Sequence, residues 1–163
     1  MQTSLPVASR SPERWLQRFE NFESVLRRLE GHLEGRAEFR DPDLLAGLVL
    51  RHYAFCLELG WKCLRDLLAW NGIDARLPRQ VIKQAFATGV IENGQLWIDM
   101  LESRPLFTAD GDLEGDDGSP EACAVLAAAA RMVAESYAPE LQALQRNLAA
   151  RRLEEQGLSE ATA

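Results

Sequence analysis

The pattern of apolar positions predicts a long amphipathic helix at the start of the chain. Large apolar residues recur there in alternating steps of four and three, which places them on one helical face. They are Trp15, Phe19, Phe22, Leu26, Leu29 and Leu33. A narrow seam of this kind is typical of helices in antiparallel bundles. Ser11 and Pro12 provide a capping residue and a first helical position, and the helix should end near Gly35.

A second long helix should open at Asp41–Pro42 and close at Asn71–Gly72, where glycine supplies the left-handed residue that ends a helix. It carries two apolar stripes instead of one. The first stripe is Leu45, Leu48, His52, Phe55, Leu59 and Lys62, and the second is Val49, Tyr53, Cys56, Gly60, Cys63, Leu67 and Trp70. A helix with two such stripes is buried between neighbours. We therefore expect this helix at the centre of a bundle or at its seam with a partner.

Two shorter helices should follow. One begins at Pro78 and closes at Gly89, and the other begins at Asn93 or Gly94 and ends before Pro105, which cannot continue a helix. Their inward residues should be Val81, Ile82, Ala85 and Phe86 in the first, and Leu96, Trp97, Met100 and Leu101 in the second.

The last helical stretch should start at Ser119–Pro120 and is rich in alanine, the strongest helix former. Pro139 should kink or break it before it continues. No segment of the chain alternates with the period of a strand. The pattern as a whole predicts an all-α fold, an up-and-down helical bundle of about five helices.

Length and charge narrow the classes of protein. A chain of 163 residues suggests one domain, which we place at residues 12–156, with a flexible arm at 1–11 and a frayed end at 157–163. The net charge of −7 argues against broad binding to nucleic acid, whose phosphates an acidic surface repels. With no apolar run near ~18 residues we expect no membrane span, and with no signal-like N-terminus a cytoplasmic protein.

The three cysteines suit neither a disulfide framework nor a zinc site. Cys56 and Cys63 lie about 10 Å apart along one helix, too far for a disulfide. Cys123 lies in another segment, and the chain has only two histidines. We expect buried thiols, and no metal site.

The residues in the middle of the chain follow an ordered pattern that resembles that of a known family. The ordered positions are Phe55, Leu57, Trp61, Lys62, Leu64, Asp66, Leu68, Gly72 and Ile73, then Pro78, Arg79, Val81, Ile82, Ala85, Phe86, Gly89 and Ile91, then Trp97, Met100, Leu101, Glu102 and Arg104. Together with the opening at residues 14–30, this run resembles the nucleotidyltransferase substrate-binding protein family over residues 13–104.

The resemblance implies a small helical bundle related to the HEPN superfamily, a HEPN-like partner of minimal nucleotidyltransferases. Members are commonly encoded beside such a transferase, which carries the metal-binding acids, and related pairs behave as toxin and antitoxin. The implied function is a non-catalytic helical subunit that binds a small nucleotidyltransferase and helps to bind its substrate. The implied partners are that transferase chain, a second copy of this chain in a homodimer, and a nucleotide; no cofactor is implied.

Two alternatives remain open. The related ribonucleases need an arginine, four intervening residues and a histidine; here Arg104 is present, but Ala109 occupies the histidine position and cannot act as an acid or base. His32 and His52 lie in other segments. An RNA-cleaving toxin would lose metal-independent cleavage on Arg104→Ala. The other alternative is a homodimeric scaffold without nucleotide chemistry.

Five residues are candidates for contact with a partner or substrate. Glu58 and Lys62 lie four apart in the order that favours a side-chain pair. With Arg104 nearby, Lys62 would bind a nucleotide phosphate or a partner carboxylate; the competing interpretation is an ordinary ion pair. Trp61 and Trp97 would stack a base, although tryptophans within apolar stripes more often belong to a core or an interface, the interpretation we favour.

The acidic loop at residues 110–121 has the spacing of an EF-hand calcium site. Asp117 at its eighth position, Glu114 at its fifth and Pro120 near its end depart from that pattern. We favour an acidic, solvated loop, and leave calcium binding open.

Overall fold

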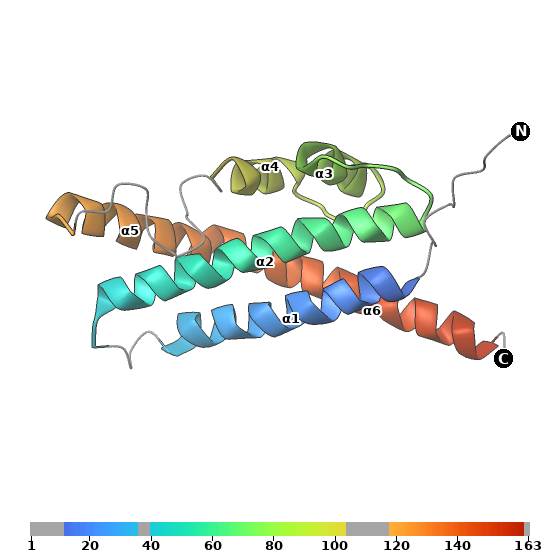
Figure 1. The fold of residues 1–163 in the computed structure, drawn as a ribbon, viewed down its shortest axis with the longest axis horizontal. Coiled ribbons are helices and arrows are strands. Elements are labelled where there is room, and N and C mark those ends of the chain that lie inside the picture. Colours follow the sequence, from blue (N-terminus) through green and yellow to red (C-terminus); the bar gives the residue numbers. More distant parts are fainter. Residues whose placement is uncertain (1–11, 36–39, 104–117, 162–163) are drawn as a thin grey trace, which may run out of the picture.

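The computed structural model describes residues 12–35, 40–103 and 118–161, and all regular structure within them is helical (Figure 1). The elements are α1 (Pro12–Glu34), α2 (Pro42–Trp70), α3 (Pro78–Ala87), α4 (Gly94–Ser103), α5 (Pro120–Met132), the π-helical turn η3 (Val133–Tyr137) and α6 (Ala138–Ala161). Because α5, η3 and α6 form one continuous helical stretch, the described chain is a bundle of five helices. The predicted all-α fold is confirmed.

The residues predicted to begin and end α2 do so in the structure. The Asp41 carboxylate accepts from the backbone N–H groups of Asp43 and Leu44, at 3.0 and 3.3 Å, and so caps α2. Gly72 follows α2 with a φ of +87°, a conformation that costs glycine nothing. The boundaries of α2 therefore follow from short-range chemistry.

The packing of α1 against α2 forms the centre of the core. The two helices run antiparallel and side by side (Figure 1), and they share the most extensive contact between elements of the described chain. The seam predicted for α1 is buried from Trp15 to Leu29, while Leu33 at its end is half-buried. Trp15, Phe19, Phe22 and Leu29 are fully inaccessible to solvent. Each of these side chains contributes about 1.5–3 kcal/mol by leaving water.

The two stripes of α2 differ in burial. The second stripe is buried from Val49 to Leu67, with Trp70 half-buried, and α2 contacts α1, α3, α5 and α6. On the first stripe Leu45 is buried, Leu48 and Leu59 are half-buried, and Phe55 is 44% exposed. The central position of α2 is confirmed, but one face of it is only partly covered.

The short helices α3 and α4 lie over the second half of α2 (Figure 1). Val81, Ile82 and Ala85 are buried as predicted. The prediction was wrong for Phe86, which is 55% exposed. Its ring covers the start of α4, where a Cβ atom added to Gly94 would lie 3.1 Å from Phe86 Cγ. Phe86 therefore covers the first turn of α4 at the surface and is not part of the core.

Pro139 neither breaks the last helix nor leaves it regular. Proline has no N–H, and in an α-helix its ring collides with the carbonyl four residues earlier. The wider turn η3 lies immediately before it, and the Ala138 N–H donates to Val133 O, five residues back. The predicted kink is therefore a π-helical turn, after which α6 runs on to Ala161, through residues where the sequence suggests fraying.

By length and composition alone, α2 is long and apolar enough to cross a membrane. Half of its most apolar stretch is buried inside the described structure, and the core helix of a soluble protein meets the same criteria. No membrane span is expected from the sequence, because it contains no apolar run near ~18 residues.

Candidate functional site

Four side chains form a cluster along α2, which we call the α2 edge cluster: Glu58, Trp61, Lys62 and Arg65. Their spacing of three and four places them on one face of the helix. Lys62 Nζ lies 3.4 Å from Glu58 Oε2, and the two side chains are 37% and 35% exposed. The predicted pair exists, and at this exposure it contributes a few tenths of a kcal/mol at most. It positions charges more than it stabilises the fold.

Trp61 lies beneath these charges and is only 7% exposed. Its indole N–H donates to Glu58 Oε2 over 3.2 Å. Lys62 Nζ and Arg65 Cζ lie 5.8 and 5.6 Å from the ring centroid, within the range of cation–π attraction. Because the ring is covered in this way, Trp61 supports the cations above it and is not open to stack on a base.

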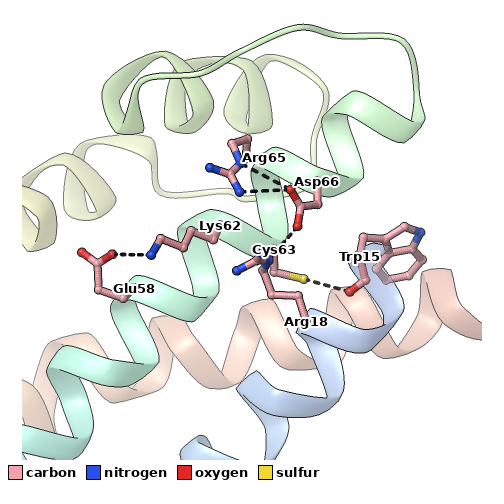
Figure 2. A network of polar contacts seen from close by, with 7 residues as sticks. All are labelled: Trp15, Arg18, Glu58, Lys62, Cys63, Arg65 and Asp66. Atoms are coloured by element: carbon pink, nitrogen blue, oxygen red, sulfur yellow. Dashed lines mark hydrogen bonds and ion pairs between the residues drawn. The ribbon is translucent and has the colours of Figure 1, made fainter. Parts of the chain in front are cut away.

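A buried acid lies next to the edge cluster, and sequence reasoning did not single it out. Asp66 is 8% exposed, and its Oδ2 accepts from Arg18 Nε of α1 over 2.6 Å (Figure 2). Arg65 Nε and Nη2 donate to Asp66 Oδ1, each over 3.3 Å. Asp66 therefore ties α1 to α2 and holds Arg65 over Trp61. An aspartate one turn after Lys62, directly before the apolar pair Leu67 and Leu68, was the available signal.

The thiols of α2 are unsuited to chemistry. Cys56 and Cys63 are free and buried, as expected, and Cys63 Sγ donates to Trp15 O over 3.6 Å (Figure 2). Burial raises the pKa of both thiols, and the neighbouring Asp66 carboxylate raises the pKa of Cys63 further. Thiols that stay protonated are poor nucleophiles and poor metal ligands.

The remaining predicted candidates do not join the edge cluster. Trp97 is fully buried in α4, and a Cβ atom added to Gly60 of α2 would lie 3.4 Å from its outer ring carbon Cη2. The structure thus brings together Glu58, Trp61 and Lys62, and it places Trp97 in the core. Arg104 and Ala109 lie outside the described residues, as does most of the acidic loop at 110–121. Among the described residues, no three acids, histidines or cysteines gather in a way that would hold a metal ion.

The fold and the edge cluster together define a class: a helical bundle with a small charged surface on its central helix. The sequence pattern of the family described as nucleotidyltransferase substrate binding protein like matches residues 17–109. That span is more than half of the 163 residues, and the chain belongs to this family. A search among curated proteins finds no match.

Proposed function

We propose that this chain is a non-catalytic helical subunit that binds a small nucleotidyltransferase through the α2 edge cluster and helps to bind that enzyme's substrate. The observation that carries the proposal is the family match, which spans α1 to α4 and includes the whole edge cluster. The description of the family names substrate binding as its role. We place the complex in the cytoplasm and extend the proposal to a regulatory pair of toxin and antitoxin type.

The surface around the edge cluster has the composition of a docking site. Phe55 precedes Glu58 by three residues and Lys62 by seven, so it lies on the same side of α2, and it is 44% exposed. Aromatic side chains and arginine are enriched in protein interfaces, and Phe55 and Arg65 bring both to this strip. Leu44, Arg51 and Ala69 of α2 are exposed as well, but this strip is the accessible part of the central helix that combines an exposed aromatic side chain with two cations.

The charge of the strip indicates what it would meet. The chain carries a net charge of −7, whereas Lys62 and Arg65 place two cations side by side around Trp61. Glu58 and Asp66 already fix the geometry of these cations, which lowers the entropy cost of binding. An acidic side chain of the transferase or a substrate phosphate would complete the cluster.

Co-expression with a small nucleotidyltransferase chain, followed by size-exclusion chromatography with light scattering, tests the proposal. We expect a co-eluting complex that Lys62→Glu weakens by about tenfold or more, because the new charge repels an acidic partner. The matched control is Lys83→Glu, which changes the other lysine of the chain on the exposed side of α3. A homodimer that elutes without the transferase would overturn the proposal and favour the homodimeric scaffold.

A further inference from the structure

A second polar site lies between α6 and the segment that joins α3 to α4. It is a pocket of about 260 Å³. Glu92, Glu140, Arg146 and Asn147 supply its polar lining, and Trp97 is part of its wall. The pocket shares no residue with the α2 edge cluster, so what it does is independent of whether that cluster binds a transferase.

The pocket contains a buried hydrogen-bond donor without an acceptor. Trp97 is fully buried, and its indole Nε1 has no hydrogen-bond partner among the described atoms. Buried donors in folded proteins are almost always paired, because an unmatched N–H has lost its water without replacing it. The unmatched donor therefore indicates that something other than the described side chains completes this site.

The Glu140 carboxylate lies near the Trp97 indole N–H, and its surroundings disfavour its charged form. Burial raises the pKa of Glu140, the neighbouring Glu92 carboxylate raises it further, and the nearby Trp97 N–H partly offsets the rise. The indole N–H thus lies close enough to the Glu140 carboxylate to lower its pKa, but its distance and angle do not make a hydrogen bond. Asn147 donates its amide out of the pocket, to Val90 O over 3.0 Å. What remains is a pair of like-charged acceptors beside one unused donor.

We propose that this pocket binds a small amino alcohol, with its protonated amine between the carboxylates of Glu92 and Glu140 and its hydroxyl oxygen accepting from Trp97 Nε1. A cation relieves the repulsion between the two carboxylates. An adjacent hydroxyl supplies the acceptor that the indole lacks. Arg146 and Glu92 are both exposed to solvent, which screens their charges, whereas Glu140 is half-buried, so Glu140 is the carboxylate whose charge most needs a cation beside it.

Three probes with the same number of non-hydrogen atoms separate the parts of this proposal: ethanolamine, propylamine without the hydroxyl, and ethylene glycol without the amine. The readout is the indole region of a ¹H–¹⁵N correlation spectrum in amine-free buffer, where the four tryptophans give four signals. Trp97→Phe assigns the Trp97 signal. Should Trp97→Phe not fold, a loss of ethanolamine binding in Glu140→Gln tests the site instead.

Ethanolamine should shift the Trp97 signal saturably, with a Kd on the order of 1 mM for so small a ligand. Propylamine should bind several-fold more weakly, and Glu140→Gln and Glu92→Gln should each weaken ethanolamine about fivefold or more. The matched control is Glu155→Gln: Glu155 Oε1 accepts from Trp70 Nε1 over 2.9 Å, so this variant should move the Trp70 signal and leave ethanolamine binding unchanged.

Two results would overturn the amino alcohol. One is the absence of a saturable Trp97 shift at tens of millimolar ethanolamine, which would mean that water alone fills the pocket. The other is an equal shift with ethylene glycol, which would mean that the carboxylates play no part. Because Lys62→Glu should leave the titration unchanged, the result does not depend on transferase binding.

Discussion

Two tryptophan–glutamate pairs join α6 to the rest of the bundle, and they differ in whether the bond is made. Trp70 of α2 donates to Glu155 over 2.9 Å near the end of α6. Trp97 of α4 lies near Glu140 at the start of α6, and its N–H remains without a partner. The same two residue types thus form a hydrogen bond in one pair and none in the other.

The surroundings of each carboxylate explain the difference. Glu140 is partly desolvated, and it shares its pocket with Glu92, a second acid that also disfavours its charge. A related contrast separates the Arg18–Asp66 contact, where opposite charges meet, from the His32–His52 contact, where like groups meet at a centroid distance of 4.7 Å. Complementary contacts hold helices together, whereas contacts between like groups respond to protons or ligands.

The largest effect should come from breaking the complementary contact at Asp66. Asp66→Ala should lower the free energy of unfolding by about 2–3 kcal/mol, because it leaves Arg18 and Arg65 without the buried acceptor that they share. Urea denaturation measures the loss.

Asp74→Ala is the matched control for this change. It removes another arginine–aspartate pair, but Arg76 and Asp74 are 84% and 74% exposed. Its cost should be far smaller than that of Asp66→Ala, because solvent screens such exposed pairs. Equal losses in the two variants would show that burial of Asp66 does not matter.

The two tryptophan–glutamate pairs should respond with opposite signs to the same substitution. Glu155→Gln should lower stability by about 0.5 kcal/mol, because a neutral amide is a weaker acceptor than the carboxylate that Trp70 now uses. Glu140→Gln should raise stability at neutral pH, because it removes a partly desolvated charge and with it the repulsion from Glu92. Thermal unfolding of both variants at pH 7 compares them.

The gain from Glu140→Gln should disappear in acid. The pKa of Glu140 is raised in the folded state, so the folded protein binds more protons than the unfolded chain between its ordinary value of 4.5 and the raised value. Wild-type stability therefore falls as the pH rises through that window. A gain that is the same above and below the window would exclude the charge of Glu140 as its cause.

The smallest effect should come from the histidine pair. Burial lowers the pKa of His32 from its ordinary value of 6.5, and the neighbouring His52 lowers it further. The unfolded chain then binds more protons than the folded protein just below pH 6.5, so stability should fall as the pH drops through that value. His52→Gln should make this dependence shallower, as chemical denaturation at pH 7.5 and 5.5 would show; an unchanged slope would assign it to burial alone.

Much of the fold follows from the sequence because local chemistry sets it. Asp41 with Pro42, and Gly72 with its positive φ, fix the ends of α2 without help from distant residues. The three-and-four spacing from Trp15 to Leu29 identified the buried face of α1. The pairing of Glu58 with Lys62 was predictable for the same reason, since both residues lie on one helix.

Contacts between helices were decided only by the tertiary structure. Periodicity tells which face of a helix is buried but not which residue of another helix it meets. It therefore could not bring Arg18 to Asp66, 48 positions along the chain, or place Trp97 and Glu140 around one pocket. Nor could it show that Phe86 covers the start of α4 and not the core. The sequence by itself determined the helices and their apolar faces; the packing of those faces determined which polar groups found partners and which did not.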